Sequence, residues 1–402
     1  MTLALPWDPE MESPATLLVV GGGPVGIEAA LYARFLGYFV SIFESRRVAH
    51  RMLDWHDRPL ALPVSQVTTS LGHAAIAAQN PEYKRPDPDR IFTGREYAEE
   101  YLLPLAKTDL LFDDIHFLSP VIDVSRRRTH RRDPIHPQER CNDEFRVVVQ
   151  GQHRGPWTAR GDCLLDCRGH AIEPIGMGPG GGLAIGERDL EKDFLLHAPS
   201  DRKYETKHLE GKRLGLIGEH ALACQCVADW LVHFAQNRDA RLVWMVRPSD
   251  HSQSDRVAAL RSKIESSSNR NILCIETLGV ESITKQEDGS FRWNLLKEDD
   301  STVELETDVA MRRTGYRYRS IGPELHAHAD GWVGSELRID ANAPRFVTAE
   351  PGYYALRAAT IEEGAGAGLP EAFEEIRRVF ALIGGREDLD LYRIVEQQSK
   401  SR

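Results

Sequence analysis

The stretch Thr16-Leu-Leu-Val-Val-Gly21-Gly-Gly23-Pro-Val-Gly26 decides the fold of this chain. Its apolar, β-branched start predicts a strand, and the G-x-G-x-x-G spacing of the glycines predicts a tight turn into a helix. The stretch Tyr38-Phe-Val-Ser-Ile-Phe-Glu44 then predicts a second strand that ends in an acid. The helix between the strands carries an apolar stripe, made by Ile27, Ala30, Leu31 and Phe35. Together these parts indicate a dinucleotide-binding βαβ unit.

Each residue type in the glycine turn has a physical role. Gly21 allows the tight turn, Gly23 lets the backbone approach a pyrophosphate, and Gly26 lets the helix lie close to the strand. The helix N-terminus offers N–H groups and a positive dipole end to phosphates, and Pro24 fits this position because its missing N–H is no loss there. Glu44 follows Gly26 by 18 residues, where an acid accepts from a ribose 2′-hydroxyl and repels a 2′-phosphate. The adenosine expected here is therefore unphosphorylated, as in FAD or NAD.

Composition limits the class of protein. The chain has 402 residues, a net charge of −11 and 41% hydrophobic residues, enough for two or three domains with a large core. The negative charge argues against nucleic acid or an anionic membrane as partner, and no apolar run is long enough to span a membrane. The first residues lack the basic and apolar regions of a signal peptide, so we expect a cytoplasmic protein.

Six cysteines without a regular framework of spacings suit a reducing compartment. The two close pairs, Cys163 with Cys167 and Cys224 with Cys226, are predicted to be buried structural thiols. No C-x-x-C motif and no zinc-type spacing of histidine and cysteine occurs, so we expect no metal site.

A second unit of the same type begins near Glu210. Strands are predicted at Gly211-Lys-Arg-Leu-Gly-Leu-Ile-Gly218 and at residues 241–246, with a helix over residues 221–236 between them. Its glycine pattern is degenerate, because His220 stands at the second glycine position and Ala223 at the third. A side chain at the second position pushes the backbone away from a pyrophosphate, so binding there is expected to be weakened or altered.

Arg247 follows the second strand of this unit, at the place where Glu44 follows its counterpart. A base at this position accommodates a 2′-phosphate, which favours NADPH over NADH as the nucleotide. An ordinary surface arginine at a strand end is an equally good interpretation.

The stretch from Ser45 to about Lys107 has little regular periodicity, apart from a capped helix that begins after Thr93. Long irregular segments in compact enzymes usually form lids or site walls. We expect residues 46–75 and 168–186 to form the walls of a substrate site. His56 and His73 are the acid–base candidates, since an unperturbed imidazole titrates nearest neutrality. An ordinary loop histidine is the alternative at each position.

The order of these parts resembles the two-dinucleotide-binding-domain flavoproteins. This superfamily includes the pyridine-nucleotide disulfide oxidoreductases, thioredoxin-reductase-like proteins and class B flavin monooxygenases. The stretch Leu164-Leu-Asp-Cys-Arg-Gly169 is similar to their strand that runs into a turn, and Thr314-Gly315-Tyr316 to the end of their return strand. The resemblance implies an α/β fold in three layers with two Rossmann-like βαβ domains. Residues 1–205 and 316–402 would form a discontinuous FAD-binding domain, and residues 206–315 an inserted NAD(P)-type domain.

The resemblance further implies FAD in the first unit and NAD(P)H that transfers hydride to flavin N5. The cofactor-binding candidates are Gly21, Gly23, Pro24, Val25, Gly26, Glu44, Ser45, Arg46, Val124, Arg168, Gly169, Gly218, Arg247 and Arg357. The chain departs from these families at Leu356-Arg357-Ala358, where they commonly carry a Gly-Asp pair that holds the ribityl chain. The C-x-x-C of the disulfide reductases and the monooxygenase signature at the second cradle are also absent.

Three functions stay open at this point. The first is an FAD-dependent oxidoreductase, NAD(P)H-linked and with monooxygenation as one form, that acts on a small organic molecule. The second is an FAD oxidase that its substrate reduces directly. The third is a flavin- or nucleotide-binding module without turnover, which the departures at His220 and at Arg357-Ala358 motivate. The sequence does not name the substrate, and a homodimer is one option for the oligomeric state.

Overall fold

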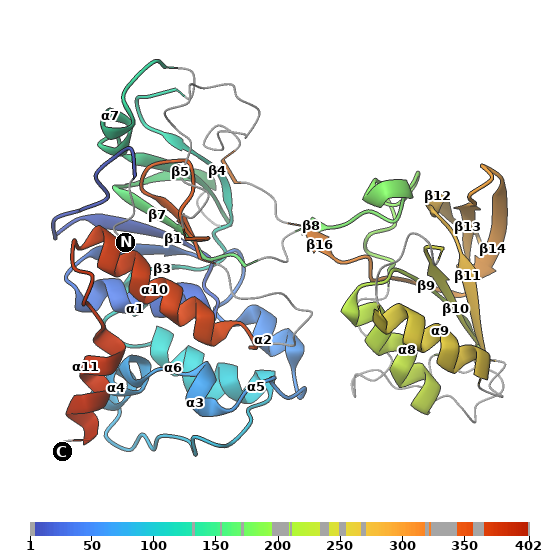
Figure 1. Ribbon diagram of the computed structural model, residues 1–402, viewed down its shortest axis with the longest axis horizontal. Coiled ribbons are helices and arrows are strands. Elements are labelled where there is room, and N and C mark those ends of the chain that lie inside the picture. The colour runs from blue at the N-terminus through green and yellow to red at the C-terminus, as the bar shows by residue number, and fades with distance from the viewer. Residues whose placement is uncertain are drawn as a thin grey trace. The chain divides into compact units, whose positions relative to one another are not determined.

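The computed structural model (Figure 1) describes residues 5–130, 133–152, 155–169, 173–194, 209, 211–233, 241–248, 255–266, 271–317, 321–322, 344–356 and 366–400. The chain divides into two compact units, Met1–His170 with Tyr318–Arg402, and Ala171–Arg317. The sequence places these boundaries at 205/206 and 315/316. The first one differs because backbone hydrogen bonds tie the segment after residue 173 to the second unit, for example from Val280 N to Met177 O at 2.9 Å.

A five-stranded parallel sheet forms the centre of the first unit, in the order β17-β7-β1-β2-β3. Its strands are β1 (Thr16–Val20), β2 (Phe39–Phe43), β3 (Ile115–His116), β7 (Cys163–Asp166) and β17 (Tyr353–Ala355). Strands β1 and β7 are buried on both faces, as central strands of parallel sheets usually are. The continuous apolar run from Leu17 to Val20 is what allows β1 to occupy this place.

Side-chain alternation along β1 separates the layers of the first unit. Leu17 and Val19 pack into the core against α1 (Pro24–Phe35) and α10 (Leu369–Ile383), whereas Leu18 and Val20 pack on the opposite face. That opposite face is covered by an antiparallel sheet of β4 (Val121–Arg126), β5 (Phe145–Gly151) and β6 (Gly155–Gly161). Helices, parallel sheet and antiparallel sheet therefore form three layers, and the predicted α/β class is confirmed.

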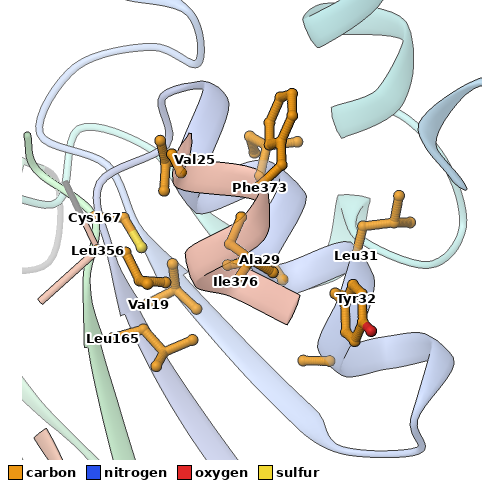
Figure 2. Close-up of a cluster of buried hydrophobic side chains, with 14 of the residues drawn as sticks. Val19, Val25, Ala29, Leu31, Tyr32, Leu165, Cys167, Leu356, Phe373 and Ile376 are labelled. Carbon is orange, nitrogen blue, oxygen red and sulfur yellow. The ribbon is translucent and has the colours of Figure 1, made fainter. Parts of the chain in front are cut away.

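The helical layer is built by segments far apart in the sequence. Figure 2 shows Ala29 and Tyr32 of α1 with Phe373 and Ile376 of α10, all in one apolar cluster with Val19 of the sheet. The predicted apolar stripe of α1 holds at Ile27, Ala30 and Leu31, which are fully buried, but is wrong at Phe35, which is 45% exposed. Phe35 is the last residue of the helix, where the chain turns towards β2.

The segment that was expected to be irregular contains several short helices. They are α2 (His50–Trp55), α3 (Val64–Val67), α4 (Ser70–Gln79), α5 (Gly94–Tyr97), the π-helix η1 (Ala98–Leu102) and α6 (Leu103–Ala106), followed by the 3₁₀ turn η2 (Phe112–Asp114). Most have only four to six residues, too few to leave a clear periodic pattern. The predicted cap at Thr93 is confirmed as a capping box with Glu96. The helix α11 (Leu391–Lys400) packs on α4, and α7 (Pro137–Cys141) lies between β4 and β5 in the sequence.

The second unit repeats the βαβ plan. A four-stranded parallel sheet in the order β11-β10-β9-β15 contains β9 (Arg213–Ile217), β10 (Arg241–Val246), β11 (Ile272–Glu276) and β15 (Val309–Arg312). The helix α8 (Ala221–His233) connects β9 to β10 along the chain, and α9 (Asp255–Ser266) lies between β10 and β11. An antiparallel sheet of β12 (Gly279–Lys285), β13 (Phe291–Leu296) and β14 (Thr302–Thr307) completes the unit, with η3 (Pro179–Gly181) and the paired β8 (Glu173–Pro174) and β16 (Tyr316–Arg317).

The cysteines of the two close pairs are buried thiols. Cys163, Cys167, Cys224 and Cys226 are all at most 6% exposed, which confirms their predicted burial. Burial raises the pKa of the Cys163, Cys167 and Cys224 thiols. Across the described part of the chain, no cluster of three or more His, Cys, Asp or Glu side chains is arranged to hold a metal ion. Among the helices that the structure describes, none is long and apolar enough to cross a membrane.

Candidate functional site

The first glycine turn is sterically forced at two of its three glycines. Gly21 has a φ of +109°, and a Cβ there would lie 2.9 Å from the carbonyl oxygen of Cys167. A Cβ on Gly26 would lie 1.9 Å from the carbonyl oxygen of Gly21. At Gly23, by contrast, an added Cβ would meet nothing within 4 Å. The turn is thus tightly packed at Gly21 and Gly26 and open at Gly23, where the backbone is expected to face a pyrophosphate.

Helix α1 begins directly at this opening. Gly23 is its N-cap residue and has no side chain to satisfy the amides of the first turn, while Pro24 occupies the first helical position. Val25 and Gly26 follow and are buried, so the helix enters the core at once. The open space beside Gly23 therefore meets the positive end of a twelve-residue helix, an arrangement that favours a bound phosphate.

The acid at the end of β2 is folded onto the glycine turn. Oε2 of Glu44 accepts a hydrogen bond of 2.7 Å from the N–H of Gly22, and Oε1 accepts one of 2.8 Å from the N–H of Arg46. The hydroxyl of Ser45 donates to the same Oε1 at 3.2 Å. Ala49 N in turn donates to Gly22 O at 3.2 Å. The structure thus brings together Glu44, Ser45 and Arg46 at the edge of the turn.

A charged pair stands on the other side of Gly21, at the end of β7. Arg168 donates from Nε and Nη2 to the two carboxylate oxygens of Asp166, each at 2.8 Å. The hydroxyl of Tyr353 donates to Asp166 Oδ2 at 2.9 Å. The Arg168 side chain is 15% exposed, and Gly169 follows with a φ of +77°. Sequence reasoning missed Asp166 and Tyr353, although an acid at the end of an apolar strand was a usable signal.

Two further candidates lie elsewhere. Val124 is fully buried between the parallel and antiparallel sheets, and its N–H donates to Ile321 O at 3.1 Å. Its side chain therefore supports the core of the first unit. Arg357 lies outside the described residues.

The second glycine turn keeps only the first glycine of the pattern, with His220 and Ala223 at the other two positions. Gly218 has a φ of +129°, and a Cβ there would lie 2.1 Å from the carbonyl oxygen of Arg313. Ala223, at the third position, is fully buried. The N–H of Arg247 donates to Glu219 Oε1 at 2.6 Å, and its guanidinium donates to Glu219 Oε2 at 2.9 Å. Sequence reasoning missed Glu219, which holds the very arginine that was expected to meet a 2′-phosphate.

The two candidate histidines have different surroundings. His73 in α4 is 4% exposed; its Nδ1 lies 2.7 Å from the hydroxyl of Tyr83 and its Nε2 2.9 Å from the hydroxyl of Thr68. Burial lowers the pKa of His73 to about 4. With both ring nitrogens bonded inside the core, its geometry favours a structural role.

His56 is more accessible. Its Nδ1 lies 2.7 Å from Asp57 Oδ2, its Nε2 contacts the guanidinium of Arg95, and its side chain is 19% exposed. The φ of His56 is +55°, a conformation that residues other than glycine rarely adopt and that recurs at functional sites. The Asp57 carboxylate assigns the proton of a neutral ring to Nδ1, which leaves Nε2 as the atom able to accept one.

A buried acid that the sequence reasoning missed lies on α1. Glu28 is 1% exposed and accepts hydrogen bonds from the Thr69 hydroxyl at 2.6 Å and the Tyr101 hydroxyl at 3.2 Å. Burial raises the pKa of Glu28 to about 7. Its signal in the sequence was the one acidic residue of a largely apolar helix, two residues after Gly26.

No protein-family model and no curated protein matches this sequence. Solved structures match it over nearly its whole length. DfoA from Erwinia amylovora, a cadaverine monooxygenase of desferrioxamine biosynthesis solved with FAD, gives a TM-score of 0.58 at 13% identity and covers 94% of this chain and 96% of its own. The bacillithiol disulfide reductase Bdr from Bacillus cereus gives 0.57 at 12% identity, covering 93% and 100%. The thioredoxin reductase of T. acidophilum gives 0.51 at 15% identity, covering 93% and 99%.

At 12–15% identity, these structures show a similarity of fold to this chain. The chain shares its overall fold with these solved structures, which include the FAD-bound monooxygenase DfoA. The fold that the resemblance implies, with two Rossmann-like βαβ units, is thereby confirmed.

Proposed function

We propose that this protein is an FAD-dependent oxidoreductase that acts on a small organic molecule. The observation that carries the proposal is the first glycine turn, which is crowded at Gly21 and Gly26 and open at Gly23. Packing does not account for the glycine at position 23, because an added Cβ there would meet no neighbouring atom. Close approach of a phosphate to the helix N-terminus does account for it.

The residues around the turn fit FAD. The backbone at Gly23 and the first turn of α1 would hold the pyrophosphate, and the carboxylate of Glu44 would accept from the adenosine ribose. Arg168, beside Gly21, adds a cation whose charge Asp166 balances. Bound FAD would supply the redox chemistry, as a flavin accepts a hydride at N5.

His56 is our candidate for the acid–base group. Asp57 holds its Nδ1 and fixes the orientation of the ring, so Nε2 is the atom that would exchange a proton with the substrate. Arg95 contacts that atom and would have to turn away first. Since the Arg95 side chain is 44% exposed, it has room to do so.

NAD(P)H is the electron donor that we propose, bound by the second unit. A test follows the absorbance of the bound flavin after anaerobic mixing with NADH or with NADPH. Loss of the oxidised flavin band with either nucleotide supports the proposal. A flavin that stays oxidised with both nucleotides would contradict it.

An FAD oxidase is the second candidate, and two features of the second glycine turn favour it. His220 fills the second glycine position, and Arg247 is already bonded to Glu219. An oxidase would need no nucleotide in this unit, because its substrate would reduce the flavin. In the same anaerobic experiment, reduction by candidate substrates but not by nucleotides identifies this case.

A further inference from the structure

The two glycine turns contain the same hydrogen bond with donor and acceptor exchanged. In the first unit Glu44, the residue after β2, accepts at 2.7 Å from the N–H of Gly22, the residue after the first glycine. In the second unit Glu219, the residue after the first glycine, accepts at 2.6 Å from the N–H of Arg247, the residue after β10. Each bond joins a glycine turn to the end of the neighbouring parallel strand.

In both units a carboxylate therefore lies between the glycine turn and the end of the neighbouring strand. Strand-end acids in βαβ units accept hydrogen bonds from the ribose hydroxyls of a bound dinucleotide. In the second unit the strand end carries a base, but the turn supplies the acid in its stead. The Glu219 side chain is 13% exposed, so its carboxylate is fixed in place and still borders solvent.

Arg247 is neutralised by this arrangement. Its guanidinium donates to Glu219 Oε2 from Nη2 at 2.9 Å and from Nε at 3.2 Å, and its carbonyl oxygen accepts from Arg261. A 2′-phosphate would have to displace the carboxylate from the guanidinium and would then lie beside a negative charge. A 2′-hydroxyl meets no such repulsion and can donate to the same carboxylate.

We propose that Glu219 determines the nucleotide specificity of the second unit and makes it select NADH over NADPH. This inference rests on the proposed function, since it requires a nicotinamide nucleotide in that unit. It reverses the preference for NADPH that Arg247 alone implies. The acid and the base lie 28 positions apart in the chain, which is why the strand-end position by itself predicts the opposite outcome.

The test is calorimetric titration of the FAD-saturated protein with NAD⁺ and with NADP⁺, so that the first unit is occupied and no redox step takes place. We expect the wild type to bind NAD⁺ at least about tenfold more tightly, a difference of about 1.4 kcal/mol. The variant Glu219→Gln keeps the size of the side chain and removes its charge. It should shift the ratio of the two dissociation constants towards NADP⁺ by about tenfold or more.

Two further variants control the experiment. Glu306→Gln loses a comparable ion pair of the same unit, to Arg292 at 3.0 Å, and should leave the ratio unchanged. Adding Arg247→Ala to Glu219→Gln should abolish the gain in NADP⁺ binding, because the released guanidinium is its source. A melting temperature close to that of the wild type shows that each variant is folded.

The outcomes distinguish the specificity role of Glu219 from the proposed use of a nicotinamide nucleotide as electron donor. If both nucleotides bind but Glu219→Gln leaves their ratio unchanged, or the wild type prefers NADP⁺, the role of Glu219 is refuted while the nicotinamide donor stands. If neither nucleotide binds to the wild type or to the folded variant, both the donor and the specificity role are refuted.

Discussion

Helix α1 packs so closely on the first turn that a Cβ on Gly26 would lie 1.9 Å from the carbonyl oxygen of Gly21. The neighbouring Gly23 has open space at the same atom position. One turn therefore combines a glycine required by packing with a glycine that leaves room for a ligand.

This contrast predicts opposite effects of two substitutions. Gly26→Ala should destabilise the fold by about 1–3 kcal/mol, because backbone must move to accept the methyl group. Gly23→Val should lower the unfolding free energy by less than about 1 kcal/mol, the cost of a branched apolar residue at an N-cap, and weaken FAD binding by about tenfold or more. Urea unfolding and FAD titration of both variants check this. A Gly23→Val protein that binds FAD like the wild type would show that the open space is not used.

The buried carboxyl group of Glu28 should make stability depend on pH. Its pKa rises from 4.5 to about 7 on folding, so its contribution is complete below pH 4.5 and is lost as the pH rises through about 7. The loss amounts to roughly 3 kcal/mol over this range. In Glu28→Gln the amide cannot ionise, and the unfolding free energy should fall less with rising pH. Equal slopes for variant and wild type in urea titrations would contradict this.

His73 should act in the opposite direction. Its pKa falls from 6.5 to about 4 on folding, so its contribution is complete above pH 6.5 and is lost as the pH falls through about 4. Between pH 4.5 and 6.5 the effects of Glu28 and His73 partly cancel in the wild type. The variant His73→Gln should therefore lose less stability on acidification, which denaturant unfolding at a series of pH values measures. Steeper acid loss in the variant would be the contrary result.

Three buried charged residues form an ion triad in the first unit. Glu350 pairs with Arg126 of β4 and with Arg140 of α7. Glu350 accepts from Arg126 at 2.7 Å and from Arg140 at 2.9 Å, and all three side chains are at most 6% exposed. Replacing the acid by Glu350→Gln removes the carboxylate that the two buried cations share, and we expect a loss of about 3–5 kcal/mol.

The neighbouring pair Arg127–Glu144 is the matched control. It has a distance of 2.6 Å but is more than a third exposed on both sides, and Glu144→Gln should cost less than about 1 kcal/mol. Denaturant unfolding measures the loss of unfolding free energy in both variants. Similar losses would mean that burial does not determine how much the triad contributes to stability.

The sequence predicted the parts that local patterns determine. The run from Thr16 to Glu44 and the strand at residues 241–246 appear at their expected places, since a buried parallel strand and a glycine turn each need a particular local composition. The helix that was expected over residues 221–236 is described over Ala221–His233.

The sequence missed what long-range contacts determine. Tyr353 reaches Asp166 across 187 positions, and Tyr101 reaches Glu28 across 73. The partner of Arg247 was missed for the same reason, and the nucleotide specificity that we propose depends on that partner. The position of a residue after a strand indicates where its charge lies. Only the folded structure shows which residue of opposite charge pairs with it.

The central claim is that the first unit binds FAD, and the direct measurement is a titration of the purified protein with FAD, followed by the visible spectrum and the melting temperature. We predict that the flavin band stays with the protein through gel filtration and that FAD raises the melting temperature, in the wild type but not in Gly23→Val. A folded wild-type protein that retains no flavin and whose melting temperature FAD leaves unchanged would contradict the account.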